Sequence, residues 1–196
     1  MKSIPRLVAD ATLGAADRHW YSIAHDLIST IANRTNMPCT HVAGVAAVLS
    51  PRITVSRNVK VLIAWFDNYN TRLRPDGLNR REVVDDFIAR YGLTRGHGAA
   101  LAHFLATGRI RGPKTVQFAE ALAGNLNACP LDIWMARALE VDQRSFTRRG
   151  PRALAVSRIT QAANTLGWRV AEAQAAIWAS TYRSWYTSPI LPSFSE

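Results

Sequence analysis

Cysteine is nearly absent from this chain of 196 residues, which contains only Cys39 and Cys129. Two thiols cannot build a disulfide framework, a four-cysteine zinc site or an iron–sulfur cluster. The five histidines also lack the spacing with carboxylates or cysteines that is typical of a metal site. We therefore expect no metal, no iron–sulfur cluster and no other cofactor, and an intracellular protein of a reducing, cytoplasmic compartment.

Long hydrophobic runs are missing as well. The longest apolar stretch, residues 42–49, is too short and too rich in small residues to span a bilayer. The N-terminal residues contain no apolar run typical of a signal peptide. Hydrophobic residues nevertheless make up 48% of the chain, which is ample for a packed core. We expect a globular monomer without membrane association.

Acidic residues are outnumbered, 14 against 24 basic ones, so the net charge is +10. A surplus of this size indicates a polyanionic partner, most often nucleic acid. An arginine-rich surface without a specific partner is the alternative. The arginines gather in predicted connections between helices, which favours a binding surface, and the partner we expect is double-stranded DNA. The connections in question hold Arg72, Arg74, Arg80 and Arg81, then Arg109 and Arg111, and finally Arg144, Arg148, Arg149 and Arg152.

No segment shows the alternation of a β-strand, whereas apolar residues recur at helical spacing almost throughout. Residues 10–34, for example, carry Leu13, Ile23 and Ile31 on one predicted face. The sequence therefore predicts an all-α protein. Its helices are predicted at residues 10–34, 40–49, 56–69, 79–91, 98–106, 113–123, 131–141, 151–166 and 170–186.

A glycine hairpin interrupts the helices at residues 108–112, within a helix-hairpin-helix element at about residues 98–123. Gly108 and Gly112 allow the backbone to turn tightly and to approach a phosphate closely. The next helix offers free N–H groups and a positive dipole end to the same phosphate. Arg109 and Arg111 add positive charge. The pattern is compatible with a DNA-phosphate contact or with an ordinary helix–helix turn ended by a glycine cap.

Lys114 follows the hairpin and is one of only three lysines in the chain. A cation in the first turn of a helix opposes the helix dipole, so this position indicates a phosphate contact or a chemical role. A lysine can act as an amine nucleophile, which arginine cannot. Eighteen residues later, Asp132 opens another predicted helix. An aspartate there is commonly an N-cap, but together with Lys114 it also suggests a site.

Gly-Pro-Lys-Thr at residues 112–115, followed by an apolar helix and by Pro-Leu-Asp-Ile-Trp-Met-Ala-Arg at residues 130–137, resembles the helix-hairpin-helix DNA glycosylase superfamily. The resemblance covers roughly residues 40–139. It implies a two-lobed helical fold with a cleft between the lobes, formed here by one compact domain over residues 1–186. The remaining residues, 187–196, are rich in proline and serine and are predicted to be a loose tail. It also implies that Lys114 is the amine nucleophile, that Asp132 activates it, and that Thr115 belongs to the DNA-binding hairpin.

A second part of this resemblance lies in Leu-Ser-Pro-Arg-Ile-Thr at residues 49–54, which is similar to a turn that inserts a side chain into the duplex. Arg52 would take that place. The first glycine of the usual hairpin is displaced here, and the cysteine cluster of the iron–sulfur branch is absent. The same turn, the Gly-Pro-Lys segment and Gln-Ala-Ala-Ile-Trp at residues 174–178 are also similar to small phage proteins linked to hypermodified thymidine, which would act in the host cytoplasm.

The resemblance implies an enzyme that flips a base out of duplex DNA and acts on the base or its sugar as a glycosylase or lyase. A transferase that adds an amino acid or polyamine to activated hydroxymethyluracil, and a DNA-binding protein without catalysis, are the alternatives. The late aromatic residues are core residues or line a pocket for the flipped base, and Gln174 is a buried amide or a base-reading group. The candidate residues are Lys114 and Asp132 for catalysis; Arg52, Gly108, Arg109, Arg111, Gly112, Thr115, Arg148 and Arg149 for DNA; and Trp134, Gln174 and Trp178 for the base pocket.

Overall fold

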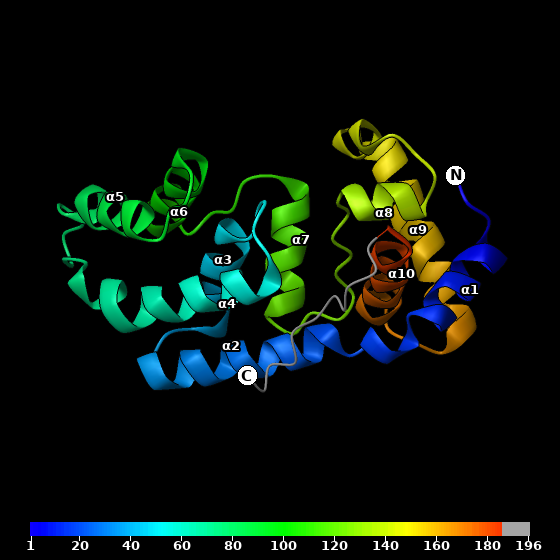
Figure 1. The fold of residues 1–196 in the computed structure, drawn as a ribbon, viewed down its shortest axis with the longest axis horizontal. Helices are drawn as coiled ribbons and strands as arrows, with labels where there is room; N and C mark the ends of the chain where they lie inside the picture. Colours follow the sequence, from blue (N-terminus) through cyan, green and yellow to red (C-terminus); the bar gives the residue numbers. More distant parts are fainter. Residues whose placement is uncertain (186–196) are drawn as a thin grey trace. The chain divides into compact units, whose positions relative to one another are not determined.

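The computed structural model describes residues 1–185, and every regular element in that range is helical. The prediction of an all-helical protein is therefore confirmed for the described residues. The end of the predicted last helix at residue 186 and the predicted tail at 187–196 lie outside them. In chain order the elements are α1 (Ile4–Leu13), η1 (Ala15–Asp17), α2 (Trp20–Thr35), α3 (Cys39–Leu49), α4 (Val55–Ala64), η2 (Trp65–Tyr69), η3 (Asn70–Arg72), α5 (Arg80–Arg90), α6 (Arg95–Thr107), α7 (Pro113–Leu122), α8 (Ile133–Ala138), η4 (Gln143–Thr147), α9 (Arg149–Leu166) and α10 (Val170–Trp185) (Figure 1).

The described chain forms two compact units, each with its own buried residues. Among the described residues, unit 1 consists of residues 1–26 and 120–185, and unit 2 consists of Leu27–Ala119. The chain passes from one unit to the other within α2 and again within α7. The hairpin belongs to unit 2, whereas α8, α9 and α10 belong to unit 1.

Unit 1 is built on close packing of α1, α8 and α9 around α10 (Figure 1). Many of its buried positions are alanines, which let helix backbones approach one another closely. Larger side chains such as Leu7, Met135 and Ile177 fill the remaining space. The buried alanines of this core are Ala11, Ala136, Ala138, Ala155, Ala162, Ala163, Ala173 and Ala176.

The predicted single helix at residues 10–34 is wrong, because the chain breaks at Gly14. α1 ends at Leu13, a short 3-10 turn follows, and α2 begins at Trp20. A Cβ at position 14 would overlap the backbone carbonyl of Ala176 in α10, so only glycine fits there. The break changes the helical register, which leaves Leu13 74% exposed and Ile23 48% exposed although both were predicted to face the core.

Unit 2 is centred on α3, whose residues 42–49 are all buried, as predicted. α3 packs against α4 and α6, and α5 packs against α6. The predicted helix at 56–69 begins one residue earlier and changes at Trp65 into a π-helical turn, η2. This turn buries Trp65 and Tyr69, whose ring centroids both lie 5.0 Å from that of Phe87 in α5.

Candidate nucleic-acid interface

The hairpin at residues 108–112 joins α6 to α7 in unit 2. α6 ends at Thr107, and its C-cap residue Gly108 has a left-handed φ of 66° and donates its N–H to the carbonyl oxygen of Phe104 at 2.7 Å. Gly112, immediately before α7, has a φ of 83°. Both glycines are exposed, and a Cβ at either position would meet nothing within 4 Å. The backbone conformation therefore calls for glycine at these positions, and both glycines leave the backbone open to a ligand.

The residues between the two glycines give the hairpin its positive charge. Arg109 and Arg111 are both exposed. The backbone N–H of Arg109 donates to Thr107 Oγ1 at 3.1 Å, which fixes the turn at the end of α6. One guanidinium nitrogen of Arg111 lies 3.3 Å from His103 Nδ1, so this arginine is held along α6. The hairpin thus combines open backbone with two arginine side chains.

Lys114 and Thr115 lie in the first turn of α7, directly after the hairpin, and both are half-buried. Within the described residues, the Lys114 amine has no hydrogen-bond or ion-pair partner. The first N–H groups of any α-helix also lack intrahelical partners. The start of α7 therefore offers an amine and backbone donors to an anionic ligand.

Arg52 occupies an exposed turn between α3 and α4, residues 50–54, and has a left-handed φ of 61°. This conformation is unfavourable for a residue with a Cβ, so the turn must be held by its surroundings. Ser50 Oγ donates to the Ala47 carbonyl at 2.9 Å, and Thr54 Oγ1 caps α4 by accepting from the N–H of Arg57. These contacts fix both ends of the turn that carries Arg52.

His97 ties the same turn to the start of α6, a contact that the sequence analysis did not predict. The side chain is 5% exposed, and its Nε2 lies 2.7 Å from the carbonyl oxygen of Pro51. Because a carbonyl can only accept, Nε2 must carry the hydrogen, and Nδ1 is then free to accept from the N–H of Thr94 at 3.1 Å. One neutral tautomer satisfies both contacts. No spacing rule signals a bond between residues 46 positions apart.

Asp132 caps α8 in unit 1. Its Oδ1 accepts from the backbone N–H groups of Trp134 and Met135 at 2.9 and 3.0 Å, which is the N-cap expected of a helix-opening aspartate. Its Oδ2 accepts from the indole Nε1 of Trp178 in α10 at 3.0 Å. Three N–H donors therefore hold the carboxylate in one orientation. Asp132 belongs to unit 1 and Lys114 to unit 2.

Trp134 and Trp178, predicted for a base pocket, belong to a half-exposed aromatic cluster in unit 1. Trp178 stacks on Tyr182 with ring centroids 5.1 Å apart, and Trp134 packs against Tyr182 at 4.8 Å. The guanidinium of Arg137 lies over the ring of Trp134 at 4.2 Å from its centroid and over that of Trp185 at 4.5 Å. The cluster thus combines aromatic surface with a cation.

Gln174, the third residue predicted for the base pocket, is buried and 2% exposed. Its Oε1 accepts from the Tyr21 hydroxyl at 2.9 Å, and its Nε2 donates to the Pro130 carbonyl at 3.1 Å. Both amide atoms are therefore engaged inside unit 1. This arrangement is that of a buried amide, one of the two interpretations open from the sequence.

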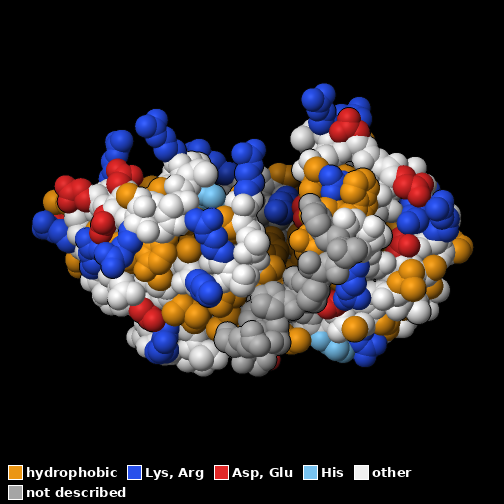
Figure 2. Space-filling view, viewed as in Figure 1, with side chains coloured by type: hydrophobic (Ala, Val, Ile, Leu, Met, Phe, Trp, Pro, Cys, Tyr) orange, Lys and Arg blue, Asp and Glu red, His pale blue; other side chains and the backbone are white. Residues whose placement is uncertain are grey.

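Arg148 and Arg149 lie at the start of α9 in unit 1, and both are exposed. Neither guanidinium contacts a carboxylate within the described residues. On the face shown in Figure 2, Lys and Arg side chains also stand out over the segment that contains α5, α6 and the start of α7. Each unit therefore presents arginines that are free to meet an anionic partner.

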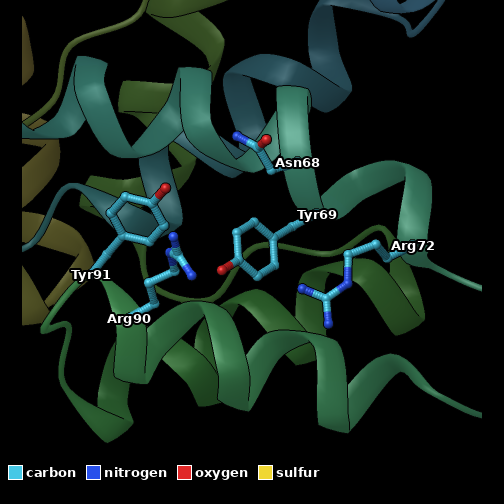
Figure 3. A pocket seen from close by; sticks show the side chains of 5 residues that line it. All are labelled: Asn68, Tyr69, Arg72, Arg90 and Tyr91. Atoms are coloured by element: carbon cyan, nitrogen blue, oxygen red, sulfur yellow. The ribbon is translucent and has the colours of Figure 1, made fainter.

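A polar cavity in unit 2 was not predicted. It has a volume of about 260 Å³ and is lined by Asn68, Tyr69, Arg72, Arg90 and Tyr91 (Figure 3). The sequence analysis placed Arg72 among the clustered arginines but had no reason to pair it with Arg90. Only the packing of η2 and η3 beside the end of α5 brings the five residues together.

The described residues contain neither a metal-binding cluster nor a membrane-spanning helix. Within residues 1–185, no group of three or more His, Cys, Asp or Glu side chains is placed to hold a metal ion. Over the same residues, no helix has the length and apolar character needed to cross a membrane.

Comparison with known proteins gives one finding. Neither the curated proteins nor the solved structures contain a match to this chain. A family model, by contrast, matches residues 7–184, which covers both units. The chain therefore belongs to the family of unknown function DUF7178.

Proposed function

We propose that this protein binds duplex DNA through the hairpin at residues 108–112 and acts on a base or on the sugar that carries it. The observation that carries the proposal is the geometry of the hairpin. Gly108 and Gly112 have left-handed φ values and open space around them, and two exposed arginines stand between them. A DNA phosphate can approach such a backbone without meeting a Cβ.

The start of α7 adds further groups that can bind the same phosphate. Its N–H groups and positive dipole end favour an anion, and Lys114 adds an amine without a partner among the described residues. Contacts of this kind recognise the phosphate backbone and position the protein without reading sequence. Arg52, on its strained and exposed turn, is the residue we propose to enter the duplex beside the target nucleotide.

For the chemical step we propose Lys114 as nucleophile. Its neutral amine attacks C1′ of the deoxyribose, the bond to the base breaks, and the base leaves with that electron pair and takes a proton from solvent. The sugar ring then opens as a proton moves from the lysine nitrogen to the ring oxygen, which leaves a protonated Schiff base. Asp132, oriented by its three N–H donors, would stabilise positive charge at the sugar. Trp134 and Trp178 would supply the surface on which the flipped base stacks.

A second candidate is a DNA-binding protein without catalysis. It is favoured by the N-cap contacts of Asp132, because they explain this aspartate without any reaction. A base-modification transferase would use the same DNA-binding surface but would transfer an amine or amino acid to the base. Measuring duplex affinity and covalent trapping separately distinguishes DNA binding from the lyase step.

The binding test compares two glycines by fluorescence anisotropy on a labelled duplex. Gly112→Ala is expected to weaken affinity about tenfold, because the added methyl group stands where the phosphate approaches and the arginines shift with the backbone. Gly167→Ala is the matched control: Gly167 ends α9 with a φ of 67° and equally open surroundings. It should lose similar stability, about 1 kcal/mol, and keep its affinity. Equal affinity for the two variants would refute the hairpin assignment.

The chemical test uses the same proteins with borohydride, which reduces a Schiff base to a stable link between protein and DNA. A panel of duplexes with damaged or modified bases is incubated with the parent protein and with Lys114→Gln. A covalent product that forms with the parent and disappears in Lys114→Gln, at unchanged circular dichroism, supports the lyase. No product on any duplex, together with intact binding, would leave the non-catalytic DNA-binding protein as the better account.

A further inference from the structure

The polar cavity in unit 2 depends on an unusual backbone. Five residues, Trp65–Tyr69, form a π-helical turn, which is rare and is frequent at functional sites. The turn places Asn68 and Tyr69 at the cavity wall, η3 adds Arg72, and the end of α5 adds Arg90 and Tyr91 (Figure 3). We name it the Tyr69 pocket. In Figure 3, Tyr69 stands between the two arginines, with its hydroxyl toward Arg90.

The Tyr69 pocket carries one unpaired positive charge, that of Arg90, because the charge of Arg72 is paired with Asp86. Two of its five lining residues are arginines, and none is acidic. Arg72 donates to Asp86 at 2.7 Å and lies over the ring of Tyr69 at 4.9 Å from its centroid, so it is fixed in place. Arg90 is exposed and has no carboxylate partner within the described residues. The guanidinium of Arg72 is therefore held in place, and that of Arg90 is available to bind an anion.

The end of α5 would by itself repel an anion, because the last carbonyls of a helix carry its negative dipole end. Arg57 of α4 offsets this negative charge. Its guanidinium donates to the carbonyl oxygens of Tyr91 and Gly92 at 2.8 and 3.0 Å. The carbonyls are thus satisfied, and a further positive charge lies beside the pocket.

The remaining lining groups donate hydrogen bonds. Tyr69 and Tyr91 each carry a hydroxyl, whereas the amide nitrogen of Asn68 already donates to the Ala64 carbonyl oxygen at 3.3 Å. The two rings pack edge to face with centroids 6.1 Å apart, and Tyr91 also packs against Phe87, so the wall is rigid. Guanidinium groups with neighbouring neutral donors are the usual partners of phosphate oxygens.

We propose that the Tyr69 pocket binds a phosphate group, with Arg90 as its principal contact and with Arg72 and the tyrosine hydroxyls as further donors. The volume of about 260 Å³ lies just below the ~300 to 1,000 Å³ of typical small-molecule sites. It suits a nucleoside monophosphate or one phosphate of a nucleic-acid backbone. The proposal does not depend on the hairpin.

The test is a titration of the whole chain, by calorimetry, with inorganic phosphate, with thymidine 5′-monophosphate and with a short duplex. Arg90→Gln is expected to weaken binding of at least one of them about tenfold, the effect of losing a charge-assisted hydrogen bond. Tyr91→Phe keeps the ring packing and removes only the hydroxyl, so it should weaken the same ligand by a smaller factor. Because Arg90 is exposed and unpaired, neither change should alter the circular-dichroism spectrum.

The control is Arg81→Gln, on the same helix. Arg81 is an exposed arginine 3.6 Å from Asp85 and outside the pocket, so its loss removes the same charge without touching the site. Loss of monophosphate binding in Arg90→Gln but not in Arg81→Gln identifies a free phosphate ester as the ligand. Loss of duplex affinity alone, in the same pattern, identifies a backbone phosphate. Equal behaviour of the two variants with all three ligands would overturn the proposal.

Discussion

Cys129 is a buried thiol in the core of unit 1, and burial raises its pKa from 9.0 to about 12. Nearby, burial raises the pKa of Tyr21 well above 10.0, and the charge of Asp132 adds to the effect. Both groups therefore keep their protons in the folded protein at a pH where the unfolded chain loses them. The stability that they contribute is complete below pH 9 and falls as the pH rises further.

We accordingly expect the free energy of unfolding to fall above pH 9, by up to about 1.4 kcal/mol per pH unit for Cys129 alone. Urea unfolding between neutral pH and pH 10.5 measures this slope. Cys129→Ala should be less stable at neutral pH, because it leaves a small cavity, but should lose less as the pH rises. Cys39→Ala, which keeps Cys129, should retain the parent's slope. A parent protein equally stable at both ends of this range would contradict the assignment.

For single residues, the sequence predicted local roles, such as helix capping, better than it predicted which distant residues form hydrogen bonds with one another. That Asp132 can cap a helix follows from its position before residues 133–138. Its second contact, from the indole of Trp178, joins residues 46 positions apart and depends on how α10 packs beside α8. The same holds for His97 and Pro51, whose bond fixes the turn of Arg52.

At the scale of elements, Gly14 decides how closely α1 and the turn after it approach α10. An alanine there would overlap the backbone of Ala176, which cannot move aside as a flexible side chain would. Gly14→Ala is expected to cost about 1–3 kcal/mol, the usual range for forcing extra atoms into a packed interface. Thermal or urea unfolding measures it.

The matched control for Gly14 is Gly150→Ala, because Gly150 lies in the first turn of α9 and a Cβ there meets nothing within 4 Å. Alanine is the better helix former, so this variant should be as stable as the parent or gain up to about 1 kcal/mol. A Gly14→Ala protein as stable as Gly150→Ala would show that the close approach does not determine the packing of unit 1.

Several helix ends could be located from the sequence, because glycine and proline signal them locally, whereas the break between α1 and α2 and the ends of α8 at residues 133 and 138 could not. Gly108 and Gly167 end α6 and α9 in left-handed conformations, and Pro113 begins α7. The π-helical turn at Trp65–Tyr69 could not be located in this way. Its residues fit an ordinary α-helix equally well. In the structure, the change from α-helical to π-helical hydrogen bonding occurs where the rings of Trp65 and Tyr69 pack on Phe87.

At the scale of the whole molecule, the net charge of +10 governs how the protein meets a polyanion. Exposed arginines occur in both units, at the hairpin and at the start of α9. If roughly 5 phosphates are neutralised, the logarithm of the duplex affinity should fall with the logarithm of the salt concentration at a slope of about −4 to −5. Anisotropy titrations at several salt concentrations, on duplexes of unrelated sequence, measure it. A flat response would rule out backbone binding as the main source of affinity.

The sequence by itself determined the all-helical class, the buried character of α3, the glycine hairpin and the basic surface, because each depends on residues near one another in the chain. Tertiary structure decided what depends on distant residues. It broke the first predicted helix at Gly14, joined His97 to the Arg52 turn, engaged Gln174 with Tyr21 and Pro130, and assembled the Tyr69 pocket. The physical reason is that helical periodicity reports which face of a segment is apolar, whereas partners are set by the packing of helices far apart in sequence.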